Sequence, residues 1–243
     1  MHPFSLSEQT VARMVAKQGR AHTIEHIEPA QTALIVVDMQ NYFMAPGQQF
    51  ETPTARVIVP NVNRLARALR GAGGSVVWIE NVATTDRDGD LWPSYAERYV
   101  PEQWTRRREA LTPGDFGFEL WPELDVRPSD MRVRKNRFSA FSPGASDLAA
   151  RLRAASIDTL LVTGVATNIC CETTARDGMM LDFTVGMVSD GCAAPSDTLH
   201  ANALTNFYGG ILRPAGTGAA RRRLTLRPHR DPAAGPRSCT PMI

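Results

Sequence analysis

The stretch that most constrains the fold of this chain is residues 157–177, IDTLLVTGVATNICCETTARD, because a strand pattern gives way to a helical one within it. Residues 159–162 are a short apolar run with β-branched side chains, which is typical of a strand buried on both faces. From Asn168 onward the spacing is helical, and residues 164–167 form the turn between the two elements. This order predicts that Cys170 lies in the first turn of a helix that follows a buried strand.

A cysteine at this position has two possible roles. Unpaired backbone N–H groups and the positive end of the helix dipole favour a thiolate there. The same N–H groups can hold an oxyanion. Most buried cysteines, however, are small apolar residues that pack beneath a sheet. The stretch alone therefore leaves Cys170 open as either a nucleophile or a packing residue.

Strand and helix patterns alternate along most of the chain. Apolar runs that predict strands occur at residues 33–37, 75–79, 183–188 and, more weakly, 131–133. Helical spacing of apolar side chains occurs at residues 7–17, 58–69, 148–155 and 199–207. The alternation predicts an α/β fold of three layers, with a mainly parallel central sheet and helices on both faces. We expect this domain to span residues 1–210.

Residues 82–130 interrupt the alternation and are rich in proline, glycine, tryptophan and charge. A connection of this length inside a domain is usually functional or carries short helices of its own. Four aromatic residues lie in it: Trp92, Tyr95, Trp104 and Trp121. We expect most of them to pack the insertion, and the alternative is that they line a pocket.

Polar residues follow three of the predicted strands. Asp38, Asn81 and Lys135 come after residues 33–37, 75–79 and 131–133, respectively. In α/β folds the ligand crevice lies just outside the carboxyl ends of the strands, so Asp38 is a candidate site residue. The alternative for Asp38 is a helix cap or turn former. Lys135 is of a type that is usually solvated, and its relevance depends on whether the fold brings it to Cys170.

Composition and cysteine usage exclude several classes of protein. The apolar content of 43% and charged content of 21% are typical of a globular chain. No apolar run approaches the roughly 18 residues that cross a bilayer, and the N-terminal residues lack the pattern of a secretory signal. Cys170, Cys171, Cys192 and Cys239 form neither a zinc spacing nor a secreted disulfide framework. We therefore expect a cytoplasmic protein with reduced thiols.

Neither a cofactor motif nor a metal motif stands out. The sequence contains no phosphate loop and no dinucleotide fingerprint, so we expect no cofactor. His22 and His26 are four residues apart, which would suit a metal on a helix. They lack an acidic partner motif, so a solvated connection is the favoured interpretation and we expect no metal.

The net charge of +2 is unevenly distributed along the chain. Residues 211–243 hold seven arginines, no lysine and one acid, which gives +6 and leaves 2 − 6 = −4 for residues 1–210. This tail also holds five prolines and no aromatic residue, so it buries too little apolar surface to order itself and is predicted to be disordered or loosely attached. One hypothesis is a C-terminus replaced through a frameshift in a GC-rich gene. The other is a basic arm for an acidic partner.

Three separated segments carry a resemblance to a known family. They are ALIVVDMQNYF at residues 33–43, RVRKNRFSAF at 132–141 and VTGVATNICCETTARDGMML at 162–181. In content, order and spacing they resemble the isochorismatase-like cysteine hydrolases, over roughly residues 30–208. The resemblance implies a single α/β domain and a catalytic triad of Asp, Lys and Cys. Carried onto this chain, the triad is Asp38, Lys135 and Cys170, because the family's T-N-x-C pattern selects Cys170 over Cys171.

The resemblance also implies a mechanism for the triad. Asp38 would take the thiol proton, and Lys135 would stabilise the resulting charges and lower the thiol pKa. The family has a non-proline cis peptide before the nucleophile turn, which here would join Val165 to Ala166. The backbone at Val165, Ala166 and Cys170 would then form the oxyanion site, with the N–H groups of Ala166 and Cys170 as donors. Asp38 would return its proton to the leaving amine, and water would hydrolyse the thioester.

The substrate class follows from a comparison of branches within the family. The nicotinamidase branch has an Asp-x-His-x-x-His metal site, but residues 82–130 contain no histidine. Isochorismatases proper lack the cysteine nucleophile. The segment at residues 135–139, KNRFS, and Asn81 resemble the ureidoacrylate amidohydrolase branch, although that branch has tyrosine where this chain has Phe138. We therefore expect an amidohydrolase that cleaves a C–N bond of a small ureido or carboxamide compound.

The expected partners are a small amide or ureido substrate and further copies of the chain in a homo-oligomer. Five residues are expected to contact the substrate: Gln40, Phe43, Asn81, Phe138 and Phe141. A binding protein that uses its basic tail on nucleic acid is the alternative from another class. It is disfavoured because the tail lacks the interleaved aromatic residues of such segments and because the whole active-site set is present.

Overall fold

The computed structural model describes residues 1–20, 24, 26–83 and 92–210, and a five-stranded parallel sheet lies at its centre. The strands are β1 (Thr32–Val37), β2 (Ser75–Asn81), β3 (Met131–Lys135), β4 (Thr159–Val165) and β5 (Thr184–Ala193). Their order is β3-β2-β1-β4-β5, and every neighbouring pair is parallel. The sheet confirms the predicted α/β class, and the weak strand predicted at 131–133 forms one of its edges.

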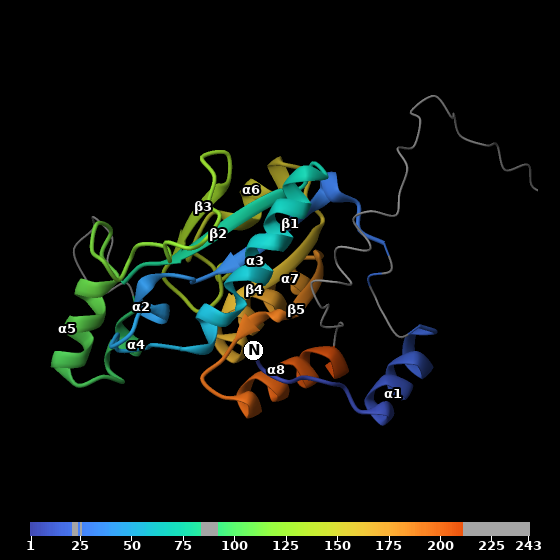
Figure 1. Cartoon of the computed structure of the whole chain (residues 1–243), viewed down its shortest axis with the longest axis horizontal. Helices are drawn as coiled ribbons and strands as arrows, with labels where there is room; N and C mark the ends of the chain where they lie inside the picture. The colour runs from blue at the N-terminus through green and yellow to red at the C-terminus, as the bar shows by residue number, and fades with distance from the viewer. Residues whose placement is uncertain (21–23, 25, 84–91, 211–243) are drawn as a thin grey trace, which may run out of the picture.

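Helices cover both faces of this sheet (Figure 1). One face is covered by α3 (Thr54–Gly71), and the other by α6 (Leu148–Ala154), α7 (Glu172–Met180) and α8 (Asp197–Gly210). Successive side chains of a strand point to opposite faces, and β1 is buried on both. Accordingly, Leu34 and Val36 belong to the core beneath α3, whereas Ile35 and Val37 belong to the core on the other side. The three predicted layers are confirmed.

The remaining elements are helical, and those that follow β1 and β2 frame the carboxyl end of the sheet. They are α1 (Glu8–Gln18), η1 (Pro29–Gln31), α2 (Asn41–Met44), α4 (Pro93–Ala96) and α5 (Pro101–Ala110). The helix predicted at residues 7–17 is α1, with the Ser7 side chain as its N-cap. The insertion at 82–130 carries α4 and α5, as expected for a connection of its length. Figure 1 shows α2, α4 and α5 beyond the carboxyl ends of β1 and β2.

The segment around Cys170 differs from its prediction in two respects. The strand continues through Val165 instead of ending near residue 163, and the following turn, η2 (Thr167–Cys171), is π-helical. Cys170 therefore lies in a π-helical turn, and the α-helix α7 begins only at Glu172. Gly164 explains the longer strand. It has φ +115°, and an added Cβ would overlap the backbone of Val37, so only glycine lets β4 continue this close to β1.

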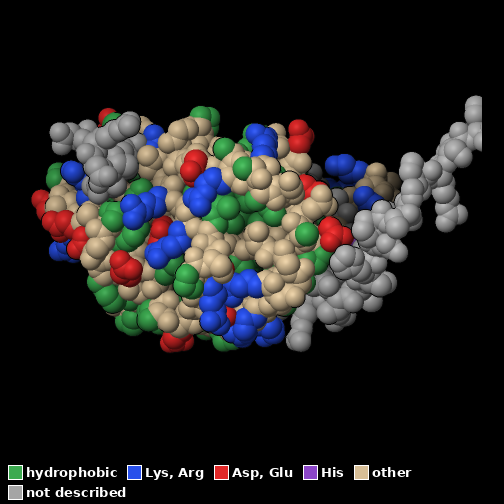
Figure 2. Space-filling view, turned by 90° about the horizontal axis from the view of Figure 1, so that it is seen from above, with side chains coloured by type: hydrophobic (Ala, Val, Ile, Leu, Met, Phe, Trp, Pro, Cys, Tyr) green, Lys and Arg blue, Asp and Glu red, His purple; other side chains and the backbone are tan. Residues whose placement is uncertain are grey.

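The surface seen from above carries charges of both signs. Lys and Arg side chains form separate groups there, with Asp and Glu side chains among them (Figure 2). Nucleic-acid-binding domains instead concentrate basic residues in one patch or stripe. Among the described residues, no helix is long and apolar enough to cross a membrane. His22 and the tail at residues 211–243 lie outside the described residues.

Replacement of Gly164 by alanine tests the close approach of β4 to β1. Gly164→Ala should lower the free energy of unfolding by roughly 2–5 kcal/mol, through positive-φ strain and the overlap with Val37. The control is Gly71→Ala at the end of α3, where an added Cβ meets no atom within 4 Å. That change should be neutral or stabilising by up to about 1 kcal/mol. Equal urea midpoints for the two variants would contradict this explanation.

Candidate active site

Three polar side chains from separate elements meet at the carboxyl-terminal edge of the sheet. Asp38 directly follows β1, Lys135 ends β3, and Cys170 lies in η2 after β4. Lys135 reaches past the intervening strand β2, and its Nζ donates a hydrogen bond to Asp38 Oδ2 at 2.7 Å. The charges of both residues act on the Cys170 thiol. The fold thus brings the three sequence-predicted residues into one cluster.

The Lys135 ammonium is fully buried and remains charged. Its Nζ also donates a hydrogen bond to the Arg137 carbonyl oxygen at 3.0 Å. Burial alone would lower the pKa of Lys135, but the charge of Asp38 and the hydrogen bond to it raise the pKa above its usual value. Buried charges are costly unless they are paired in this way. Lys135 is therefore a permanent positive charge beside Asp38 and Cys170.

Asp38 leaves one carboxylate oxygen free within this cluster. Its backbone has φ 52°, in the left-handed region that aspartate tolerates better than most residues, and its N–H donates to the Ile79 carbonyl oxygen at 3.0 Å. Oδ2 receives the hydrogen bond from Lys135. Oδ1 is buried and accepts no hydrogen bond within the part of the chain that the structure describes. This oxygen is available to accept a proton.

The Cys170 side chain is 6% exposed, and its thiol is protonated at neutral pH. Burial raises the pKa of Cys170 to about 12; the positive charge of Lys135 lowers it, whereas the Asp38 carboxylate raises it. The sequence favoured a thiolate at a helix start. In the structure burial outweighs the positive charge of Lys135, so the pKa of the resting thiol is raised instead of lowered. A protonated thiol needs a base before it can attack a carbonyl carbon.

The turn before Cys170 has the predicted cis peptide between Val165 and Ala166. The Ala166 carbonyl oxygen accepts hydrogen bonds from the N–H groups of Ile169 and Cys171, both at 3.1 Å. The N–H of Cys170 does not donate to this carbonyl oxygen. Val165, Ala166 and Cys170 all line the same cavity. The three residues whose backbone was expected to hold an oxyanion therefore lie beside one cavity, and their role as an oxyanion site stays a prediction.

This cavity has a volume of about 240 Å³. Three of the five residues expected to contact substrate line it: Phe43, Asn81 and Phe138. Further walls come from the segment after α2, from α4 and α5, and from the segment after β5: Gln49, Phe50, Glu51, Thr52, Tyr95, Arg107 and Pro195. Ile169 completes the wall beside Cys170. A space of this size holds a small substrate.

The other two expected substrate residues, Gln40 and Phe141, are not among the residues that line the cavity. Gln40 is fully buried; its Nε2 donates to the carbonyl oxygens of Asn81 at 3.1 Å and Phe118 at 2.8 Å, and its Oε1 accepts from the Asn81 N–H at 2.7 Å. Gln40 thus fixes the backbone of Asn81. Phe141 stacks on Phe183 with ring centroids 5.6 Å apart, against the core beneath α7.

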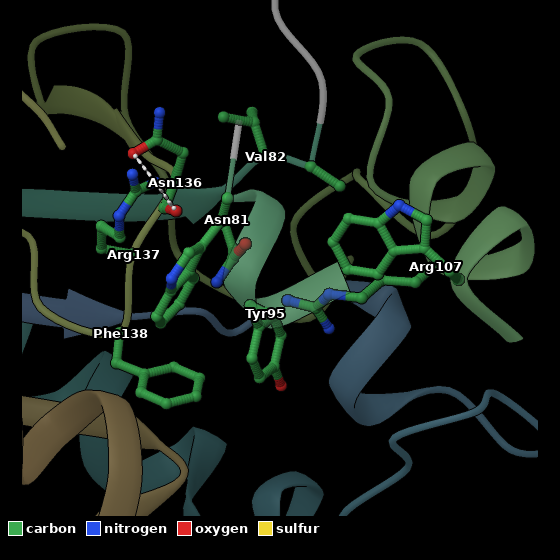
Figure 3. A pocket seen from close by; sticks show the side chains of 10 residues that line it. Asn81, Val82, Tyr95, Arg107, Asn136, Arg137 and Phe138 are labelled. Carbon is green, nitrogen blue, oxygen red and sulfur yellow. Dashed lines mark hydrogen bonds between the residues drawn. The ribbon is translucent and has the colours of Figure 1, made fainter. Parts of the chain in front are cut away.

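The cavity also contains residues that the sequence did not single out as site residues, above all Arg107 of α5. Figure 3 shows its side chain reaching from α5 toward Asn81 and Tyr95. Arg107 is the middle residue of three consecutive arginines, a run that usually belongs to a solvated helix face, so no sequence signal marks it as a site residue. Trp92, Tyr95 and Trp104 pack on one another as expected, with ring centroids 4.6 Å apart for Trp92 and Tyr95 and 6.2 Å for Tyr95 and Trp104, and Tyr95 also lines the cavity.

The described residues give no sign of a metal centre. Within residues 1–20, 24, 26–83 and 92–210, no group of three or more His, Cys, Asp or Glu residues could hold a metal ion. His26 is exposed and is not part of a helix. The three described cysteines, Cys170, Cys171 and Cys192, are free thiols.

Comparison with known proteins identifies the family to which this chain belongs. The isochorismatase domain model matches residues 32–215. The chain is 31% identical over 201 residues to the ureidoacrylate amidohydrolase RutB of Caulobacter vibrioides, covering 76% of this chain and 88% of that protein. A cysteine hydrolase from Pseudomonas syringae pv. phaseolicola superposes with a TM-score of 0.73 at 28% identity, covering 85% of this chain and 98% of that one.

A further solved structure is the N-carbamoylsarcosine amidase from Thermoplasma acidophilum, with a TM-score of 0.60 and 27% identity, covering 77% of this chain and 96% of the other. The fold, the family model and the relatives named as hydrolases define the class as a hydrolase. The chain belongs to the isochorismatase family. The resemblance stated from the sequence is confirmed.

The buried ion pair can be tested by removing one charge at a time. Lys135→Met should lower the free energy of unfolding by about 3–5 kcal/mol, because it leaves Asp38 buried without its partner. Adding Asp38→Asn should recover most of that loss, since asparagine also tolerates the left-handed backbone. Arg67→Met is the control, because the Arg67 side chain is 58% exposed in its pair with Asp125. It should change stability by no more than about 1 kcal/mol.

The same pair predicts how stability depends on pH. The pKa of Lys135 is raised in the folded protein, so its contribution is fully present below its ordinary value of 10.5. It is lost as the pH rises through the folded-state value. Urea titrations from pH 9 to 12 should show a steeper fall for the wild type than for the Asp38→Asn/Lys135→Met variant. Parallel curves would show that the pair is not coupled to folding.

Proposed function

We propose that this chain is a cysteine-dependent amidohydrolase that cleaves a C–N bond of a small ureido or carboxamide substrate. The observation that carries the proposal is the fully buried Lys135–Asp38 pair, at 2.7 Å, next to a thiol that lines a cavity. A thiol with a raised pKa, a free carboxylate oxygen and a fixed positive charge are the parts that base-assisted thiol attack requires.

The reaction begins with attack of Cys170 Sγ on the carbonyl carbon of the substrate. Asp38 Oδ1 takes the thiol proton as the S–C bond forms, and Lys135 offsets the negative charge at the site. The carbonyl oxygen becomes an oxyanion that the N–H groups of Ala166 and Cys170 bind. Asp38 then gives its proton to the leaving nitrogen as the C–N bond breaks, which releases ammonia or an amine.

Water completes the cycle. The acyl group is held on Cys170 as a thioester, or as an S-carbamoyl group when a ureido nitrogen was expelled. Asp38 accepts a proton from the attacking water, and the thiol leaves with that proton. The acid product departs, and the free thiol and the ionised Asp38 are restored. The original thiol proton therefore leaves with the nitrogen product, and a proton from water restores the thiol.

A ureido substrate has support from two relatives. One is named for ureidoacrylate and the other for N-carbamoylsarcosine, and both compounds carry a ureido group. The cavity of about 240 Å³ suits molecules of this size. We place ureidoacrylate-like compounds first among the candidate substrates, and an isochorismatase-like hydrolase of another small substrate is the alternative. The cytoplasmic location and the homo-oligomer stay predictions.

The nucleophile can be assigned by comparing two adjacent cysteines. Cys170→Ala should abolish ammonia release from small ureido and carboxamide compounds, whereas Cys171→Ala should retain most of it. Cys170 lines the cavity, but the Cys171 thiol points to the Thr163 carbonyl oxygen at 3.7 Å beneath the sheet. Both variants should keep the wild-type free energy of unfolding, measured by urea titration, to within about 1.5 kcal/mol.

Mass spectrometry of the enzyme quenched during turnover supplies an independent readout. The added acyl or carbamoyl mass should be found on the peptide that contains Cys170 and should disappear in Cys170→Ala. An adduct on Cys171 in the wild type, or full turnover by Cys170→Ala, would overturn the proposed mechanism.

A further inference from the structure

Arg107 is a buried cation for which the proposed reaction has no use. Its side chain comes from α5, and the residue is 6% exposed. Its only hydrogen bond to a described residue runs from Nη1 to the Tyr42 hydroxyl at 3.4 Å, which is long for such a bond. No carboxylate of the described residues lies within 4.0 Å of it. A guanidinium has five N–H donors, so the described residues use little of its capacity.

Aromatic rings hold this guanidinium in place. Its central carbon lies 5.4 Å from the ring centroid of Tyr42, 5.7 Å from that of Phe50 and 5.5 Å from that of Tyr95. Cation–π contacts of this kind attract the charge but leave its N–H groups free. Burial raises the pKa of Tyr42 despite the nearby Arg107, so its phenol is neutral and is not a counterion. The charge is therefore fixed but not neutralised.

The positively charged side chain of Arg107 belongs to the wall of the cavity beside Cys170. Arg107 lines both that cavity and an adjoining small pocket, together with Asn81, Tyr95 and Phe138 (Figure 3). The other charged residue of the lining, Glu51, already accepts hydrogen bonds from Arg56 at 2.9 Å and from the Gly47 N–H at 2.8 Å. Lys135 is paired with Asp38. Among the described residues that line the cavity beside Cys170, Arg107 carries the one positive charge, and no described carboxylate pairs with it.

We propose that Arg107 binds a carboxylate of the substrate, so that the enzyme selects small anionic ureido or carboxamide compounds over neutral ones. A planar guanidinium matches a carboxylate with two parallel N–H···O bonds, which fixes the orientation of the substrate as well as its position. The carboxylate would lie toward α5 and the scissile carbonyl group toward Cys170. This assignment rests on the proposed function for the cleaved group, but the carboxylate site itself does not require turnover.

Turnover of a matched substrate pair tests the assignment. The pair is 3-ureidoacrylate and its neutral amide, 3-ureidoacrylamide, and the variants are Arg107→Gln, Arg107→Lys and the control Arg106→Gln, whose side chain is exposed on the same helix. For the carboxylate, Arg107→Gln should lower kcat/KM roughly 100-fold or more, mainly through KM. Arg107→Lys should lie between Arg107→Gln and the wild type. For the neutral amide, Arg107→Gln should change kcat/KM less than about threefold, and the control should resemble the wild type on both compounds.

Alkylation of Cys170 provides a second test that does not depend on turnover. Iodoacetate and iodoacetamide differ mainly in charge, and the ratio of their rates cancels any change in thiol reactivity. Arg107→Gln should lower the iodoacetate-to-iodoacetamide ratio at Cys170 at least fivefold, whereas Arg106→Gln should leave it unchanged. Equal urea midpoints for Arg107→Gln and the wild type would show that folding is intact, and Arg107→Lys, which keeps the charge, should preserve most of the ratio.

The two tests separate this inference from the proposed function. If neither ureido compound is hydrolysed but the alkylation ratio depends on Arg107, the carboxylate site stands and the ureido function fails. If both compounds lose activity equally in Arg107→Gln and the ratio is unchanged, Arg107 only holds α5 against the aromatic rings. That result would overturn the carboxylate site and leave the proposed chemistry at Cys170 intact.

Discussion

The ion pair between Lys135 and Asp38 is the interaction on which the site depends. Both side chains are fully buried, and the 2.7 Å hydrogen bond joins the end of β3 to the end of β1 across β2. Removing two charges from water costs several kcal/mol per ion, so such a pair is weak evidence for stability alone. Its presence at the carboxyl ends of the strands, beside a thiol in a cavity, is what an active site would require.

The pair also explains why a thiol with a raised pKa is compatible with nucleophilic chemistry. Burial raises the pKa of Cys170 to about 12, so a standing thiolate is not the reactive form at neutral pH. Lys135 holds Asp38 Oδ2, while Oδ1 has no hydrogen-bond partner among the described residues. Asp38 can then accept the proton during attack and return it to the leaving nitrogen. A buried thiol with a raised pKa is also less prone to oxidation than a thiolate.

Local sequence patterns predicted the five strands and the longer helices, because burial leaves a periodic record, but they missed α2 and the extension of β5 to Ala193. Local patterns could not predict the contact between Lys135 and Asp38, because it depends on the order of the strands in the sheet. Only the family resemblance indicated it. The local pattern around Cys170 favoured a lowered thiol pKa, but burial raises this pKa, and burial depends on tertiary packing that a local pattern does not reveal. Gln40 lies at a strand end but turns to the Asn81 backbone. Arg107 lies in a run of arginines whose burial only the packing of α5 reveals.

The central claim is that Cys170 rests as a thiol beside a carboxylate that raises its pKa. It is tested most directly by following thiolate absorbance near 240 nm with pH, as the difference between the wild type and Cys170→Ser. The account predicts no Cys170 thiolate in the wild type up to about pH 10, and a lower pKa in Asp38→Asn, where Lys135 acts on the thiol without the opposing carboxylate. A Cys170 thiolate in the wild type at pH 7, or an unchanged or higher thiol pKa in Asp38→Asn, would contradict it.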